Sequence, residues 1–263
     1  MEQKEIDLSD QIQNWKLDNI IYLDTPKSFI DEADEDFEYL DIDFSSPLVK
    51  DLLTLAPFKN SSEQTKQELL FIKNFQNQSY NEVFLSHLKE MDETPAQFII
   101  DYYEEISNKK VSESLKEIIF SRDVERLAMK LKLHFGRARP YQVAEHHGIE
   151  ISYNKSIQSG TGASPSYPSG HTLIAYFVAQ ALSYLDPVFE TQLLHRARLV
   201  ALSRIKEGVH FQSDNLFSEY IAEHILMPEF KNTFDPHGHY DSNQKGHSCC
   251  PSLQEKFGSS CKH

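Results

Sequence analysis

Apolar residues recur at helical spacing through most of the chain between about residues 61 and 228. Leu69 and Ile72 are three residues apart, and Phe98 and Tyr102 are four apart, so each pair lies on one face of an α-helix. Sustained alternation of apolar and polar residues is missing, as are the dipeptides that favour tight β-hairpins. The pattern therefore predicts an all-α helical bundle.

Start and stop signals divide this pattern into separate helices. Ser61-x2-Gln64 fits a capping box, and Thr94-Pro95 fits an N-cap followed by the first helical position. A long helix is expected to start at Ser112 or Ser114 and to end near Pro140, because the residue before proline disfavours the α conformation. The remaining expected elements are a polar loop over 141–167 and helices over about 169–185, from 187 into the 200s, and over about 212–227, before Pro228.

The net charge of −14 is concentrated at one end of the chain. Residues 1–49 hold 14 Asp and Glu and 3 Lys, so the other 214 residues sum to only −3. We divide the chain into an acidic N-terminal extension (1–49), an all-α catalytic domain (50–228) and a polar C-terminal tail (229–263) that we expect to be flexible. Charge repulsion favours disorder in the extension, whereas its interleaved Phe37 and Leu40 favour docking, and we expect docking on the chain's own core.

The positions of the cysteines and the sequence of the N-terminus indicate the cellular compartment. Cys249, Cys250 and Cys261 all lie in the last fifteen residues, so no disulfide framework holds the predicted bundle. The tail lacks a Cys-x2-Cys pair, and we expect reduced thiols there rather than a metal site. The N-terminus lacks the features of a secretory signal peptide, and no stretch approaches the roughly 20 apolar residues of a membrane span. We therefore expect a soluble, cytoplasmic protein.

Three short stretches carry phosphate-handling residues at tight spacing. They are Lys132-x6-Arg139-Pro140, Pro168-Ser169-Gly170-His171 and Ser203-Arg204-x5-His210-x3-Asp214. Together they contain three cationic side chains, two histidines and one carboxylate, which is a set that can transfer a phosphoryl group without a metal. Each stretch alone is a weak signal, and all three in this order are a strong one.

His210 and Asp214 are four residues apart, so on a helix they share a face. A carboxylate hydrogen-bonded to one ring nitrogen fixes the imidazole tautomer and leaves the lone pair of the other nitrogen free to attack. The alternative is an ordinary His–Asp pair on a helix surface. Arg204, six residues upstream, and the other two stretches favour the catalytic interpretation.

Ser169 and Gly170 are expected at a helix start, where unsatisfied backbone N–H groups and the helix dipole attract anions. The Ser169 hydroxyl adds a donor, and Gly170 lets the backbone approach a phosphate closely. His171 is placed to protonate the departing alcohol as a general acid. Alone, this stretch would fit a simple helix-starting turn.

Lys132 and Arg139 are seven residues apart, two helical turns, so they are expected on one face of a helix. With Arg204 they would offset the charge that spreads over the oxygens of the transferred phosphoryl group. The alternative is a solvated basic helix end, and we assign Arg137 and His134 to that description.

The three stretches resemble the type 2 phosphatidate phosphatase and vanadium haloperoxidase superfamily. The sequence around them is most similar to that of the soluble class A acid phosphatases. The similar segments are Ser166-Tyr167-Pro168-Ser169-Gly170-His171-Thr172 and His210-Phe211-Gln212-Ser213-Asp214. The resemblance covers about Lys132 to Asp214. It implies an all-α bundle in which His210 is the nucleophile that becomes phosphorylated.

We favour a metal-independent acid phosphatase that hydrolyses small-molecule phosphate monoesters through a phosphohistidine and needs no cofactor. A haloperoxidase would use the same residues with vanadate as cofactor, and a non-catalytic phosphate-binding interaction protein is a third alternative. Nucleic acid is disfavoured as a partner because no basic stripe with interleaved aromatic residues occurs; an oligomer is allowed. Since histidine ordinarily titrates near pH 6.5, we expect the best activity at mildly acidic pH, with His210 neutral and His171 protonated.

Overall fold

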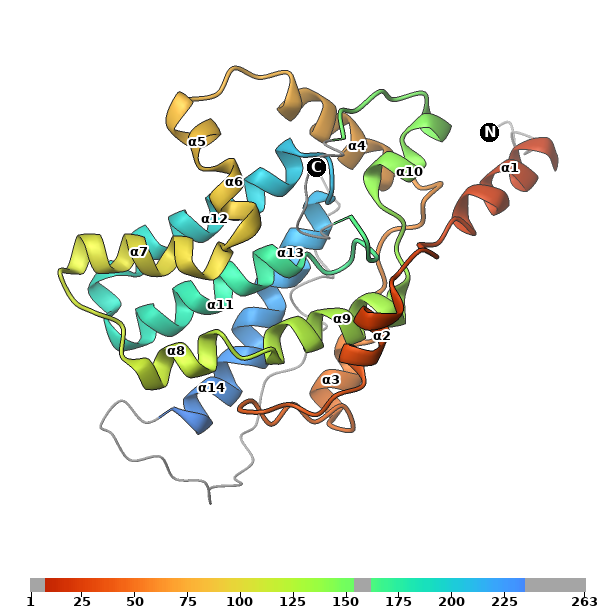
Figure 1. The fold of residues 1–263 in the computed structure, drawn as a ribbon. Helices are drawn as coiled ribbons and strands as arrows, with labels where there is room; N and C mark the ends of the chain where they lie inside the picture. The colour runs from red at the N-terminus through yellow and green to blue at the C-terminus, as the bar shows by residue number, and fades with distance from the viewer. Residues whose placement is uncertain (1–7, 154–161, 235–263) are drawn as a thin grey trace, which may run out of the picture.

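Helix α11 (Gly170–Leu185) runs through the middle of the fold, with α7, α9, α12 and α13 packed against it (Figure 1). Ten of its sixteen residues are buried. Its sequence is apolar nearly all round, and a helix of that kind is stable only when other helices cover it. The computed structural model describes residues 8–153 and 162–234.

Helices follow one another along the described residues, joined by turns and irregular segments. The N-terminal part contains α1 (Leu8–Asp18), α2 (Lys27–Ala33), α3 (Pro47–Leu52), α4 (Glu63–Gln76), α5 (Glu82–Ser86), α6 (Leu88–Glu93) and α7 (Pro95–Ser107). The C-terminal part contains α8 (Glu113–Ile119), α9 (Asp123–Phe135), α10 (Pro140–Val143), η1 (Glu145–His147), α11, η2 (Pro187–Phe189), α12 (Glu190–Lys206), α13 (Gln212–Ile221), the π-turn η3 (Ala222–Leu226) and α14 (Met227–Thr233).

The all-α prediction is confirmed. Within residues 8–153 and 162–234 the structure has no strand, and the one β-type contact is an isolated antiparallel bridge between Ile21 and Arg137. None of the described helices combines the length and the apolar composition needed to cross a bilayer. The three cysteines and all but the first part of the predicted tail lie outside the described residues.

The long helix predicted from Ser112 or Ser114 to near Pro140 is wrong in two places. It is broken between α8 and α9, where Ser121 donates its hydroxyl to the carbonyl of Ile118. It also ends early, because Gly136 adopts a left-handed conformation with φ of 60°. A glycine in this conformation is the commonest helix stop. Residues 137–139 therefore leave the helix.

Two other boundaries differ from the sequence prediction. Ser62, not Ser61, caps α4, and its hydroxyl accepts from the N–H of Thr65 at 3.1 Å. Pro228 does not end the last helix, since it occupies the first turn of α14 after the π-turn η3. Proline is tolerated there because first-turn N–H groups have no helical partner. The predicted loop 141–167 contains most of α10 and η1.

The acidic extension docks on the chain's own core, as expected. Asp123, fully buried at the start of α9, accepts hydrogen bonds from the backbone N–H groups of Glu38, Tyr39 and Leu40 at 2.7 to 2.9 Å. Leu40 is completely buried in the main apolar cluster. Three hydrogen bonds to one carboxylate satisfy its charge and fix this acidic segment against α9.

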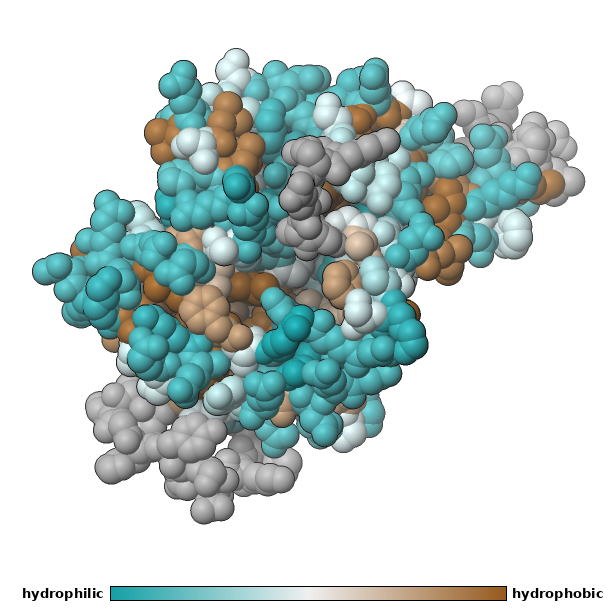
Figure 2. All heavy atoms as spheres, in the orientation of Figure 1, coloured by the Kyte–Doolittle hydropathy of each residue, from teal (hydrophilic) through white to brown (hydrophobic). Residues whose placement is uncertain are grey.

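Buried apolar residues form two clusters, and the predicted site residues lie between them. The main cluster surrounds α11 and includes Tyr167, whereas the smaller one joins α4 to Ala138 and Phe211. Most of the face seen in Figure 2 is hydrophilic. Hydrophobic residues reach the surface along the segment between α1 and α2, where Ile21 and Leu23 are exposed.

Candidate active site

His210 is held from both sides by buried polar groups just before α13. Its Nδ1 lies 3.1 Å from the Oδ2 of Asp214, and its Nε2 lies 2.9 Å from the Nη1 of Arg139. Because a guanidinium can only donate, Nε2 must be the acceptor and Nδ1 must carry the proton. The contacts therefore select a single tautomer with its lone pair on Nε2.

The His210–Asp214 pair does not arise from a shared helix face, as the spacing suggested. His210 precedes the helix, and Phe211 is the N-cap of α13. Asp214 sits at the third helical position and accepts the N–H of Phe211 at 2.8 Å, which is the reciprocal half of a capping box. The same carboxylate therefore starts α13 and orients the imidazole.

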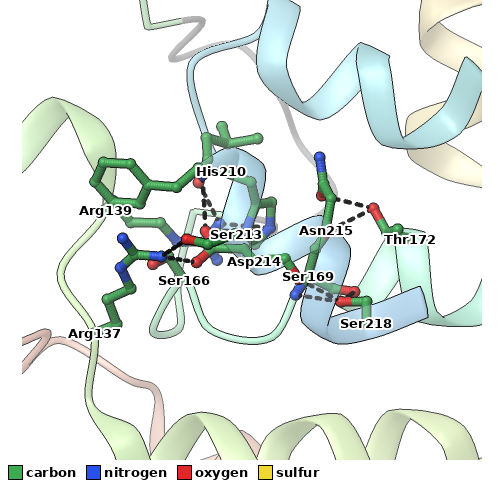
Figure 3. Close-up of polar contacts among 12 residues, drawn as sticks. Arg137, Arg139, Ser166, Ser169, Thr172, His210, Ser213, Asp214, Asn215 and Ser218 are labelled. Carbon is green, nitrogen blue, oxygen red and sulfur yellow. Dashed lines mark hydrogen bonds and ion pairs between the residues drawn. The ribbon is translucent and has the colours of Figure 1, made fainter. Parts of the chain in front are cut away.

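Arg137 is part of this site, which corrects its assignment to a solvated helix end. It is buried and donates to Asp214 at 2.5 Å and to Ser213 at 2.7 Å (Figure 3). It also donates to Glu68 at 3.0 Å. Its guanidinium also lies 3.9 Å from the centre of the Phe211 ring. The early stop at Gly136 is the signal that would have placed Arg137 outside the helix.

Lys132 and Arg139 converge although they do not share a helix. Lys132 lies in the last turn of α9 and donates to the carbonyl of Pro165. Arg139 follows the helix stop, precedes α10, and donates to the carbonyls of Ser164 and Val209 at 2.8 Å each. Burial and the charge of Arg139 hold the pKa of Lys132 well below its ordinary value.

The start of α11 is joined to the start of α13. The hydroxyl of Ser218 accepts from the N–H of Ser169 at 2.9 Å and donates to the carbonyl of Asp214 at 2.7 Å (Figure 3). Thr172 bonds to Ser169 at 2.9 Å and to Asn215 at 2.8 Å.

Ser169 is the N-cap residue of α11, at the predicted helix start, although its hydroxyl caps no backbone N–H. Gly170 is the first helical residue, and a Cβ built on it would meet no heavy atom within 4 Å. The backbone at this helix start is thus open on one side, in the way that close approach of a phosphate requires.

Arg204 and His171 form the second half of the site around Asp92, an acid in α6 that the sequence did not single out. Arg204 donates to the Oδ1 of Asp92 at 2.6 Å and lies 2.7 Å from the Oε2 of Glu207. The Nε2 of His171 lies 2.7 Å from the carbonyl of Asp92 and 3.5 Å from its Oδ1. Asp92 therefore positions both a predicted phosphate ligand and the predicted general acid.

The two histidines do not keep their ordinary pKa values, which overturns the expectation that both titrate near pH 6.5. Burial, then the charges of Arg139, Lys132 and Arg204, hold the pKa of His210 well below that value. Burial and Arg204 lower the pKa of His171 to about 3, although Asp92 acts in the opposite direction. Both rings are thus neutral at mildly acidic pH in the free protein.

Burial raises the pKa of Asp214 to about 6, and Arg137 opposes the change. The carboxylate is therefore still ionised at neutral pH.

All eight predicted site residues lie in one region, at the ends of α9, α10, α11, α12 and α13. The structure adds three residues that were not among the predicted site residues: Arg137, Glu68 and Asp92.

The chain is similar in sequence to a known family and to two curated proteins. Residues 119–235, which are less than half of the chain, match the family model of the PAP2 superfamily. An acid phosphatase from Zymomonas mobilis subsp. mobilis is 42% identical over 85 residues, which are 32% of this chain and 31% of that protein. A non-specific acid phosphatase from Providencia stuartii is 30% identical over 105 residues, 38% of this chain and 41% of that protein.

The chain thus spans less than half the length of either of these curated relatives. The sequence resemblance is confirmed at the level of the PAP2 domain and of acid phosphatase relatives.

Proposed function

We propose that this protein is an acid phosphatase-like enzyme that hydrolyses small-molecule phosphate monoesters through a phosphohistidine at His210, with no metal ion in the reaction. The observation that carries the proposal is the pair of contacts on the His210 ring. Asp214 accepts from Nδ1–H, so the lone pair is on Nε2 and is the nucleophile. Arg139, which donates to Nε2 in the free protein, would turn its donors to the phosphate oxygens when substrate binds.

Positive charge around His210 favours the transition state over the bound ester. Lys132, Arg139 and Arg204 are all close enough to lower the pKa of His210. Fixed cations in a buried site interact strongly with charge that develops on the equatorial oxygens, and this is the main catalytic effect in phosphoryl transfer. The helix start at Gly170 adds backbone N–H groups to the same anion.

The reaction has two steps. In the first, Nε2 of His210 attacks phosphorus, the bond between phosphorus and the ester oxygen breaks, and His171 gives its proton to the departing alkoxide. In the second, water attacks the phosphohistidine, the P–N bond breaks, and the water proton passes to His171. The products are the alcohol and inorganic phosphate.

His171 must be protonated to act in the first step, yet the ring is neutral in the free protein at pH 6. A phosphate dianion bound beside the ring would favour the imidazolium, as any opposite charge within several ångströms does. Asp92 already acts in that direction. We therefore assign the charging of His171 to substrate binding.

One test measures the release of phosphate from 4-nitrophenyl phosphate in excess chelator. A second test stops the turnover of a ³²P-labelled ester with alkali or with acid and compares the label that stays on the protein. We expect full activity without added metal and an acid-labile, alkali-stable label. His210→Ala should lose both turnover and label, whereas His195→Ala, an exposed histidine of α12, should keep both. Strict dependence on Mg²⁺ or Zn²⁺, or a label that persists in His210→Ala, would reject the mechanism.

Halide oxidation with peroxide after loading with vanadate, in a protein that releases no phosphate, would favour the haloperoxidase alternative instead.

A further inference from the structure

Three tyrosines with no part in the proposed reaction gather beside Arg139. The rings of Tyr141, in α10, and Tyr153 are stacked, with centroids 4.1 Å apart and planes at 20°. Tyr22, between α1 and α2, donates its hydroxyl to the carbonyl of Gly162. The Tyr153 hydroxyl lies against the same glycine, where an added Cβ would collide with it. We call Tyr22, Tyr141 and Tyr153 the tyrosine cluster.

The tyrosine cluster borders the phosphate-binding side of the site. Tyr141 follows Arg139 by two residues, and Arg139 donates to the carbonyl of Ser164, two residues after Gly162. Burial lowers the pKa of Arg139 to about 10, and Asp214 and the three phenols oppose that change. Because such interactions weaken with distance, the phenols and the guanidinium are neighbours.

Tyr22 reaches the cluster because the chain before α2 is attached to the segment that carries the site arginines. Ile21 forms the isolated bridge with Arg137, and the N–H of Tyr22 donates to the carbonyl of Gly136 at 3.1 Å. In extended backbone successive side chains point to opposite sides. Ile21 and Leu23 are accordingly exposed, whereas Tyr22 points to Gly162.

All three rings are half-buried, so each presents part of its surface to solvent. Aromatic side chains bind planar rings by stacking, and this depends little on which ring is bound. The segment that contributes Tyr22 lies outside the residues that match the PAP2 domain. Tyr22 therefore joins the tyrosine cluster from outside the matched residues, which contain Tyr141 and Tyr153.

We propose that the tyrosine cluster binds a planar aromatic group on the leaving alcohol, so that aryl and nucleoside phosphate monoesters are preferred over aliphatic ones. The proposal rests on the phosphatase function proposed above. It assigns substrate selection to the Arg139 side of the site and leaves the chemical steps with His210 and His171.

Binding of two phosphonates to the full chain tests this without turnover. Benzylphosphonate and cyclohexylmethylphosphonate carry the same charged group and rings of similar size, but only the benzyl ring is planar. Neither has an ester bond to break. By calorimetry we expect benzylphosphonate to bind about 10-fold more tightly, within the range that stacking of one ring produces. Tyr153→Leu should weaken benzylphosphonate about 10-fold and change the other ligand by less than about 2-fold.

Two matched variants separate stacking from structure. Tyr153→Phe keeps the ring and should keep the preference. Tyr184→Leu removes a tyrosine of α11 that packs edge-on against Phe230, far along α11 from Gly170, and should change neither affinity. If Tyr153→Leu does not fold, Tyr22→Leu in the surface segment should reduce the preference instead.

Equal affinity of the unaltered protein for the two phosphonates would overturn the proposal, and so would equal weakening of both ligands in the leucine variants. A preserved benzyl preference in a protein that releases no phosphate from any ester would reject the phosphatase function and leave the aromatic site standing. With turnover intact, comparing adenosine 5′-monophosphate with ribose 5-phosphate, and benzyl with cyclohexylmethyl phosphate, identifies the favoured ring; either preference supports the proposal.

Discussion

The two histidines of the site lie in different electrostatic surroundings. We call His210, Asp214 and Arg137 the fixed half of the site, and His171, Asp92 and Arg204 the His171 half. His210 is 1% exposed, among three cations, with its protonation and tautomer set by Asp214 and Arg139. The side chain of His171 is 18% exposed and lies against Asp92, which partly compensates the charge of Arg204. The fold therefore fixes the protonation state of the proposed nucleophile, His210, and leaves that of the proposed acid, His171, to the anion that binds beside it.

The largest expected effect comes from breaking the fixed half. Asp214→Asn keeps the size of the side chain but no longer enforces the Nδ1–H tautomer of His210, and it removes the charge that pairs with Arg137. We expect kcat to fall on the order of 10⁴-fold, as when the orienting carboxylate of a catalytic triad is replaced by its amide. Asp186→Asn, a carboxylate at the far end of α11, is the control; a loss below 10-fold would contradict the orienting role.

Removing the acid should give an effect that depends on the substrate. His171→Ala is expected to slow hydrolysis of alkyl phosphates by about 10² to 10⁴-fold, because an alkoxide departs poorly without a proton. Esters of acidic phenols such as 4-nitrophenol should be slowed much less. The check is kcat across a series of leaving groups, and equal slowing throughout the series would remove His171 from the acid role.

Arg137 tests how far the fixed half depends on its buried ion pairs. Arg137→Ala leaves Asp214 and Glu68 without their partner, and we expect it to cost about 3–5 kcal/mol in the free energy of unfolding. Arg122→Ala breaks a pair with Glu32 whose arginine is exposed, and should cost at most about 1 kcal/mol. Urea unfolding of both variants measures the difference. A similar loss in the free energy of unfolding for both would show that the ion pairs of Arg137 contribute no more to stability than an exposed pair.

The smallest effect concerns pH and the His171 half. Burial raises the pKa of Glu207 to about 7, with Arg204 acting against the shift and Asp92 for it. The folded state then keeps a proton that the unfolded chain releases above pH 4.5, so this stabilisation is complete below pH 4.5 and is lost as pH rises towards 7.

Glu207→Gln should accordingly show a smaller loss of stability than the unaltered protein between pH 5 and pH 7, measured by denaturant unfolding. Glu125→Gln, on the solvent side of α9, is the control and should follow the unaltered protein. An identical pH dependence in Glu207→Gln would show that Glu207 is ionised throughout.

The sequence predicted much of the scaffold because helix signals are local. The spacing of Leu69 and Ile72, the Thr94-Pro95 start and the helix start at Ser169 and Gly170 each depend on a few neighbouring residues, and each appears in the structure. The break before Asp123 was missed because that aspartate serves a distant segment: it accepts the N–H groups of residues 38–40, a demand invisible in its own surroundings.

The three motifs, by themselves, determined which eight residues to look for, since spacing and residue type are properties of the chain. Only the tertiary structure decided that Arg137, Glu68 and Asp92 join them, because these contacts come from α4, α6 and the segment after α9. It also decided the pKa values of His171 and His210. Those depend on burial and on charges brought close by folding, and no local pattern records how far from water a side chain will be.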